Sequence, residues 1–169
     1  SYMETKSHLG ALQITAENTP NYKTCACSEI LVVDDDEFNL LAMKSQLEAL
    51  NLTCLDFASN GQEAVDRFKE REKCQRHCCK SCYALIFIDC EMPLKNGLDA
   101  TQEIREFIKG NCNRDHIIIG VSGHSTPEFF QKCKDVGMND VITKPIRKKQ
   151  LQESLKAFKN LSIVKSIHL

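Results

Sequence analysis

The segment ALIFIDCEMPLKNG, residues 84–97, joins an apolar run to a carboxylate and then to a loop. Residues 84–88 are all apolar or small, and a continuous apolar run of this length is typical of a strand that is covered on both faces of a sheet. The run leads directly into Asp89, and the following Pro93 and Gly97 indicate a shaped loop. A buried strand gains nothing from a carboxylate at its tip unless a group outside the strand binds it. Asp89 is therefore the first candidate functional residue.

Strand-like and helical patterns alternate on both sides of this segment. The expected strands cover residues 30–33, 53–57, 84–88, 116–121 and 141–143. Each is followed by apolar residues at the three- and four-residue spacing of an amphipathic helix. Five strand–helix units in succession predict an α/β fold with a doubly wound, five-stranded parallel sheet and helices on both of its faces.

Local signals mark several helix boundaries. The sequence from Ser59 to Glu63 offers a capping box, and Thr126-Pro127 is typical of a cap followed by proline at the first helical position. Gly110 is expected to end the helix after the third strand, since glycine is favoured just beyond a helix C-terminus. The last amphipathic helix is expected to carry the apolar residues Leu151, Leu155, Phe158 and Leu161.

Length and charge limit the domain count and the classes of partner. The 169 residues suffice for one domain with a sizeable core. We expect a tail or linker over residues 1–27, one domain over 28–161 and a second tail over 162–169. The 22 basic and 23 acidic residues give a net charge of −1, so no overall field attracts nucleic acid or an anionic membrane. No apolar run approaches the roughly 18 residues of a membrane-spanning helix.

The chain has ten cysteines, which is many for its size. Several are spread one per predicted element, as small buried residues are, and this indicates reduced thiols and a cytoplasmic location. Four others are grouped in an insertion over residues 72–83, and Cys25 and Cys27 lie in the expected N-terminal tail. Sulfur and imidazole ligands at such spacing could hold zinc in a tetrahedral site, and the alternative is a loop with free thiols. The possible zinc ligands are Cys74, His77, Cys78, Cys79 and Cys82.

Polar and charged side chains follow four of the five predicted strands. Asp34 and Asp35 follow the first strand, Asp89 the third, Ser122 the fourth and Lys144 the fifth. The carboxyl ends of parallel strands share one edge of the sheet, where ligands bind in open α/β folds. Clustered carboxylates repel one another unless a cation compensates them, and an all-oxygen site of this kind suits Mg²⁺. A lysine and a hydroxyl beside that cation predict a site for a tetrahedral oxyanion, with one carboxylate as nucleophile.

Four motifs at these strand ends resemble those of the receiver domains of two-component response regulators, in particular receivers fused to eukaryotic hybrid histidine kinases. They are ILVVDDDEFNL, LIFIDCEMPLKNG, IIIGVSGH and VITKPI, in the family's order, within residues 29–160. The resemblance implies a flavodoxin-like fold with strand order 2-1-3-4-5.

The resemblance also implies the roles of the site residues. Asp89 would be the phosphoryl acceptor, Ser122 the hydroxyl that binds the phosphoryl group, and Lys144 the cation that pairs with it. A magnesium ion would neutralise the charge that gathers there. The ion would be held by the carboxylates of Asp34, Asp35 and Asp89 and by the backbone carbonyl of Glu91.

The same resemblance predicts features of the backbone around the site. Pro145 would follow a cis peptide, and Gly123 would leave room for an incoming phosphohistidine. Gly97 would supply a backbone conformation that other residues resist. Three positions before the lysine, where the family has an aromatic switch residue, this sequence has Val141, so the usual rotamer-coupled readout lacks its side chain.

The function implied is that of a phospho-acceptor in a two-component phosphorelay. A histidine kinase, a histidine phosphotransfer protein or both would be the partners, and no nucleic-acid partner or membrane segment is expected. The chain would not be an enzyme in the ordinary sense, although it would catalyse its own phosphorylation and dephosphorylation. It would be a fragment of a hybrid histidine kinase.

Three other interpretations remain open from the sequence. A phosphatase of the haloacid-dehalogenase type would use Asp34 as nucleophile and Asp36 as acid, but it leaves Asp89 unexplained. In the receiver interpretation Asp36 is only a helix cap. An interaction module that is never phosphorylated would have no use for the site residues. The basic residues between Arg147 and Lys165 could bind nucleic acid, although a basic helical face is usually just solvated.

Overall fold

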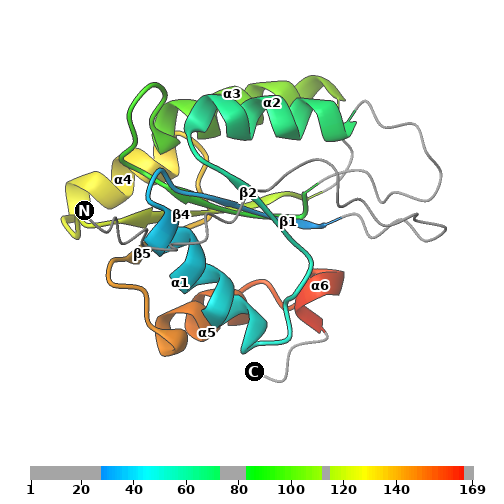
Figure 1. Ribbon diagram of the computed structural model, residues 1–169. Helices are drawn as coiled ribbons and strands as arrows, with labels where there is room; N and C mark the ends of the chain where they lie inside the picture. Colours follow the sequence, from blue (N-terminus) through cyan, green and yellow to red (C-terminus); the bar gives the residue numbers. More distant parts are fainter. Residues whose placement is uncertain (1–27, 73–82, 112–114, 166–169) are drawn as a thin grey trace, which may run out of the picture.

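Strands and helices alternate from residue 30 to residue 156 in the computed structural model, and a short helix over residues 162–165 follows (Figure 1). The structure describes residues 28–72, 83–111 and 115–165, and no helix within these ranges is long and apolar enough to cross a membrane. The predicted tail over 1–27 and the cysteine cluster with its zinc prediction lie outside the described residues. The elements are β1 (Ile30–Val33), α1 (Glu37–Glu48), β2 (Leu55–Ala58), α2 (Gly61–Glu72), β3 (Leu85–Asp89), α3 (Gly97–Asn111), β4 (Ile117–Ser122), α4 (Pro127–Asp135), β5 (Asp140–Thr143), α5 (Lys148–Lys156) and α6 (Ser162–Lys165).

The five strands form one parallel sheet in the order β2-β1-β3-β4-β5. β3 lies at its centre, with Ile88 opposite Val33 of β1 and Asp89 opposite Val121 of β4. Helices α1 and α5 cover one face of the sheet, and α2, α3 and α4 cover the other (Figure 1). The predicted doubly wound fold and its strand order are therefore confirmed, and the carboxyl ends of all five strands share one edge.

Side chains of β3 alternate between two apolar cores, which explains its continuous apolar run. Leu85 and Phe87 pack in the core under α1 and α5, whereas Ile86 and Ile88 pack in the core under α2 and α3. All four are at most 1% exposed. Burying one such side chain stabilises a fold by about 1.5–3 kcal/mol. The strand is thus held on both faces, and Asp89 at its end is held with it.

The predicted helix caps of α2 and α4 are present. Asn60 Oδ1 accepts the amide of Glu63 at 2.9 Å, and the Glu63 carboxylate accepts the amide of Ser59 at 2.8 Å. Thr126 Oγ1 accepts the amide of Phe129 at 3.3 Å, and proline occupies the first turn of α4. These side chains satisfy amides that the first turn of a helix leaves unpaired.

The predicted end of α3 at Gly110 is wrong. The helix continues through this glycine to Asn111. A side chain built at Gly110 would meet no atom within 4 Å, and its φ angle is not positive. Glycine here costs the helix about 1 kcal/mol relative to alanine but does not stop it.

The prediction that one helix carries all four apolar residues up to Leu161 is also wrong. α5 ends at Lys156, because the amides of Ala157 and Phe158 bond to carbonyls three residues back and so tighten the chain into turns. Phe158 and Leu161 still pack against the core under α1 and α5. α6 follows, and its Val164 is 2% exposed within the same core. Packed structure therefore continues past residue 161.

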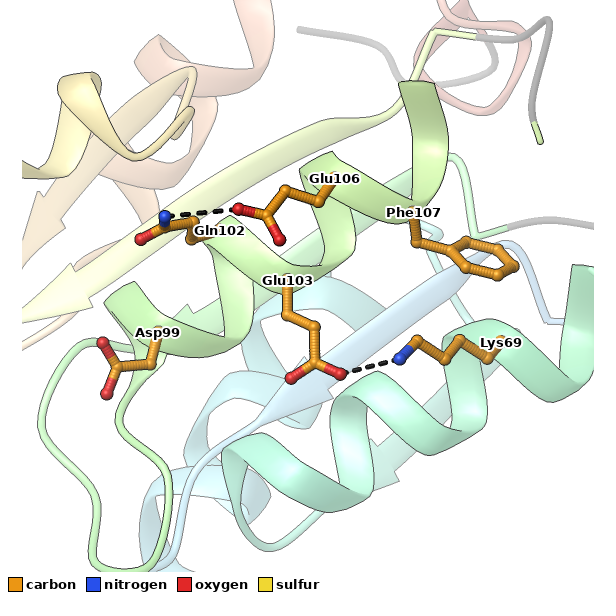
Figure 2. A pocket seen from close by; sticks show the side chains of 6 residues that line it. All are labelled: Lys69, Asp99, Gln102, Glu103, Glu106 and Phe107. Atoms are coloured by element: carbon orange, nitrogen blue, oxygen red, sulfur yellow. Dashed lines mark hydrogen bonds and ion pairs between the residues drawn. The ribbon is translucent and has the colours of Figure 1, made fainter. Parts of the chain in front are cut away.

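An ionic bridge joins α2, α3 and the loop after β3. Figure 2 shows the part of it in which Glu103 of α3 meets Lys69 of α2. Glu103 of α3 accepts hydrogen bonds from Lys69 of α2 at 2.7 Å and from Lys95 of the loop. These two bonds hold the pKa of Glu103 below its usual value. Lys69 Nζ also lies 5.9 Å from the ring centre of Phe107. The bridge ties the loop that follows Asp89 to two helices.

Replacing Glu103 by glutamine should lower the free energy of unfolding by about 0.5–1 kcal/mol, because partly exposed ion pairs contribute little. The folded state lowers the pKa of Glu103, so the bridge stabilises above the unfolded carboxyl's pKa and is lost as pH falls through the folded pKa. Urea denaturation should therefore separate Glu103→Gln from the wild type at neutral pH and not in acid. Glu106→Gln, on the same helix, is the control. A difference that does not change with pH would contradict this explanation.

Candidate functional site

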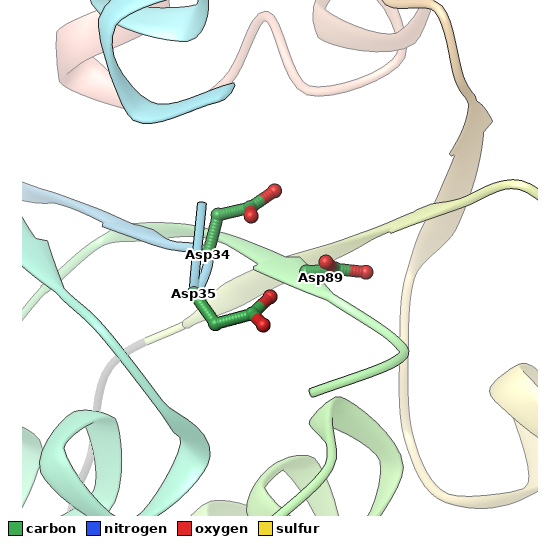
Figure 3. A group of neighbouring side chains, drawn as sticks. All are labelled: Asp34, Asp35 and Asp89. Atoms are coloured by element: carbon green, nitrogen blue, oxygen red, sulfur yellow. The ribbon is translucent and has the colours of Figure 1, made fainter. Parts of the chain in front are cut away.

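Three carboxylates meet at the carboxyl edge of the sheet. Asp34 follows β1, Asp35 comes next, and Asp89 ends the neighbouring strand β3. Figure 3 shows the three side chains extending in the same direction, and one oxygen of each lies within 4.8 Å of the other two. Asp34 is 6% exposed and Asp89 is 3% exposed, whereas Asp35 faces solvent. The structure thus brings together the three acids that the sequence singled out.

Lys144 compensates the two buried acids. Its Nζ lies 2.9 Å from Asp89 Oδ2 and 3.3 Å from Asp34 Oδ2. Burial of the ammonium group works to lower the pKa of Lys144, but the hydrogen bond and charge of Asp89 and the charge of Asp34 outweigh it, and the pKa is raised. Lys144 therefore stays protonated and lies between the two carboxylates as their shared counter-ion.

Burial dominates the ionisation of Asp89. Desolvation raises the pKa of this carboxyl, and the negative charge of Asp34 adds to the effect. Two hydrogen bonds lower the pKa again, one from Lys144 and one from the amide of Glu91 to Oδ1 at 3.0 Å. They do not outweigh the desolvation, and the pKa of Asp89 stays above its usual value. A carboxylate in this position is less well solvated than one in water, which makes it costly to ionise and receptive to a further cation.

Ser122 lies at the end of β4, next to β3, and is fully buried. Its carbonyl accepts the amide of Lys144 at 2.7 Å, and its Oγ accepts the amide of His124 at 2.9 Å. Gly123 leaves open space, since a side chain there would meet no atom within 4 Å. The hydroxyl, the lysine and an open approach therefore occur together at the same strand ends.

Two contacts around the site involve side chains to which the sequence assigned no role, those of His124 and Asn39. The carboxylate of Glu91 pairs with the ring of His124 from the loop after β4, and this ring lies 5.2 Å from that of Phe129. Asn39 of α1 donates to Asp34 Oδ1 at 3.2 Å. Glu91 and His124 are far apart in the chain, and an asparagine inside a helix carries no signal of its own, so no pattern in the sequence predicts these contacts.

The backbone around the site agrees with the predictions, except for the reason why position 97 is a glycine. The Lys144–Pro145 peptide is cis, as expected. The prediction that Gly97 supplies an unusual backbone conformation is wrong, because its φ angle is not positive. Glycine is needed here because the backbone of Asp89 lies so close that a Cβ would be 2.2 Å from its carbonyl oxygen. Val141 is half-buried and packs against the core under α2, α3 and α4, so no aromatic ring stands at that position.

Asp36 is a helix cap. Its Oδ1 accepts the amide of Phe38 at 2.8 Å, at the start of α1. The three-carboxylate cluster does not include it. This placement of Asp36 gives no support to a haloacid-dehalogenase-type site, which would use Asp34 as nucleophile and Asp36 as acid.

Comparison with known proteins agrees with this geometry. The sequence model of the response regulator receiver domain matches residues 30–156. Hybrid signal transduction histidine kinase C of Dictyostelium discoideum is 32% identical over 138 residues, which are 80% of this chain and 10% of that protein. Against hybrid signal transduction histidine kinases A and B of the same organism, the chain covers 6% of each. It therefore spans a tenth or less of the length of these curated relatives.

Solved structures share the fold. The receiver domain of the histidine kinase CKI1 from Arabidopsis thaliana, complexed with Mg²⁺ and BeF₃⁻, is 26% identical, with a TM-score of 0.65 over 78% of this chain and 89% of that one. A chain in the co-crystal structure of the Saccharomyces cerevisiae phosphotransfer protein Ypd1 with the receiver domain of Ssk1 is also 26% identical, with a TM-score of 0.64 over 82% of this chain and 91% of that one. The fold, the acids at its strand ends and the family match agree, and the chain belongs to the response regulator receiver domain family.

Proposed function

We propose that Asp89 accepts a phosphoryl group from the phosphohistidine of a histidine kinase or a histidine phosphotransfer protein. The observation that carries this proposal is a pair of buried carboxylates, Asp89 and Asp34, held by the single ammonium group of Lys144. Burying like charges side by side is costly. This cost is explained if Asp89 is a nucleophile and the neighbouring acids hold the metal that the reaction uses.

The reaction needs positioning and charge neutralisation more than covalent help from the protein. An Oδ of Asp89 attacks phosphorus, the O–P bond forms, the P–N bond breaks, and its electron pair leaves with the imidazole. Lys144 compensates the charge of the phosphoryl oxygens, and the Ser122 hydroxyl donates to one of them. The chain would thereby catalyse its own phosphorylation and, with water as acceptor, its own dephosphorylation.

The residues present fit a magnesium ion, because three carboxylates in reach of one another are the oxygen ligands that Mg²⁺ prefers. Asp34, Asp35, Asp89 and the backbone carbonyl of Glu91 would hold it. When bound, the ion would neutralise charge on the phosphoryl oxygens. The Mg²⁺ in the CKI1 receiver domain supports this assignment.

Mg²⁺ should stabilise the protein, and Asp35→Ala should remove that effect. The unfolded chain has no such site, so an ion at about 100 times its dissociation constant adds about 2.7 kcal/mol to the free energy of unfolding. Thermal melts with and without Mg²⁺ measure the shift. Asp36→Ala is the neighbouring control: it should lower stability through the lost cap but keep the Mg²⁺-dependent rise. An undiminished rise in Asp35→Ala would mean that the metal is held elsewhere.

Large apolar side chains are exposed on α1 and in the loop after β3, and they suit a protein partner. Phe38 is 82% and Leu41 57% exposed on α1, and Leu94 is 90% exposed in the loop after β3. Both segments directly follow strands that end at the site, so exposed apolar side chains on them are candidates for an interaction surface. The co-crystal structure of Ypd1 with a receiver domain supports a phosphotransfer protein as that partner. The chain would then be the receiver part of a hybrid histidine kinase, as its relatives suggest.

A small donor tests the proposal without a kinase. Acetyl phosphate with Mg²⁺ should add one phosphoryl group to the chain, seen as an intact-mass increase that hydroxylamine reverses, since it cleaves acyl phosphates. Chelating the metal should prevent the addition. No addition from acetyl phosphate or from any phosphohistidine protein would overturn the proposed function.

A further inference from the structure

The two oxygens of Asp34 have different surroundings. Oδ1 accepts the amide of Asp36 at 2.9 Å and the side-chain amide of Asn39 at 3.2 Å. Oδ2 lies 3.3 Å from Nζ of Lys144, which is also 2.9 Å from Asp89 Oδ2. Oδ1 is thus hydrogen-bonded to groups at the start of α1, whereas Oδ2 faces the shared lysine.

Asp34 and Asn39 border a small cavity that is otherwise apolar. Its volume is about 10 Å³, and apolar side chains that include Met43 and Phe87 line the rest of it. This volume is at the lower limit for one water molecule, and a water also needs two or more polar partners. The Asn39 amide is therefore the side-chain donor that reaches Asp34 Oδ1 from α1.

We infer that Asn39 is a positioning residue for the metal site: its hydrogen bond, together with that of the Asp36 amide, fixes the rotation of the Asp34 carboxylate so that Oδ2 points to the bound cation. The inference rests on the proposed magnesium site. Without the bond from Asn39, the amide of Asp36 alone holds Oδ1, so the carboxylate turns more easily toward Lys144, with which the metal must then compete. Partners of metal ligands typically affect metal affinity by about 10–100-fold.

Two substitutions separate positioning from packing. Asn39→Leu keeps the side-chain size, removes the donor and keeps water out. We expect it to weaken Mg²⁺ binding about tenfold. Asn39→Ala opens enough room for a water that can donate to Oδ1, so we expect a smaller loss, about threefold. A role in packing alone gives the opposite order, because alanine leaves the larger void.

The measurement is a Mg²⁺ titration of the whole chain by isothermal calorimetry, with urea denaturation of the metal-free proteins beside it. Ser45→Ala, exposed on the same helix, should bind Mg²⁺ as the wild type does. The expected result is weaker binding in the order wild type, Asn39→Ala, Asn39→Leu, with metal-free stability of Asn39→Leu close to that of the wild type. Binding within twofold of the wild type in Asn39→Leu, or the reverse order, would overturn the positioning role. A wild type that binds no Mg²⁺ would instead overturn the metal site on which the inference rests.

Discussion

Asp89→Asn should abolish the uptake of a phosphoryl group from acetyl phosphate. The amide that replaces the carboxylate is no nucleophile toward phosphorus, and the other two acids of the cluster would be occupied with the metal. Intact mass after incubation with donor and Mg²⁺ should show the unmodified chain alone. Asp36→Asn is the matched control, because asparagine caps a helix as well as aspartate does and the fold is kept. Modification that persists in Asp89→Asn would contradict the assignment.

The same variant should be more stable than the wild type without metal. Burial raises the pKa of Asp89, so the fold disfavours its ionised form. That penalty is present above the folded pKa and disappears below the unfolded pKa, where the carboxyl is protonated in both states. Asp89→Asn should therefore unfold at higher urea concentration at neutral pH and match the wild type in acid. Loss of function with a gain of stability is the expected sign of a residue kept for its chemistry.

Lys144→Ala should destabilise the metal-free protein by about 2–4 kcal/mol. The change leaves Asp34 and Asp89 buried side by side without their shared counter-ion. The loss should fall below that of a fully buried pair, because the Lys144 side chain is 29% exposed and solvent screens part of the interaction. Urea denaturation measures it, and Lys149→Ala, exposed on α5, is the control.

Mg²⁺ should restore more stability to Lys144→Ala than it adds to the wild type, since the ion then supplies the missing positive charge. The phosphorylated form of this variant should also be lost faster, because no ammonium group compensates the phosphoryl oxygens. A stability within about 0.5 kcal/mol of the wild type would show that Lys144 is only a surface lysine.

The sequence was sufficient for the fold because the central strand is unambiguous. The apolar run before Asp89 is buried on both faces, and the alternation of strand-like and helical patterns around it predicts a parallel sheet. The acids, Ser122 and Lys144 were predictable as a group, since each directly follows or ends a strand and parallel strands bring such positions to one edge.

Other features depend on contacts that a linear pattern does not contain. α5 ends at Lys156 because the backbone tightens into turns, although the apolar spacing continues to Leu161. The closeness of Gly97 to the Asp89 carbonyl follows from how the loop folds back. The hydrogen bond from Asn39 to Asp34 depends on the conformations of both side chains, which the spacing of residues along the chain does not determine.

Chemical trapping of the phosphoryl group tests the central claim most directly. Borohydride reduces an aspartyl phosphate to homoserine, which marks the modified residue permanently. After treatment with acetyl phosphate and Mg²⁺, then borohydride, peptide mass spectrometry should find homoserine at position 89 and aspartate unchanged at positions 34 and 35. Homoserine at Asp34 or Asp35, or at none of the three although the donor and Mg²⁺ were present, would contradict the assignment of Asp89 as the phosphoryl acceptor.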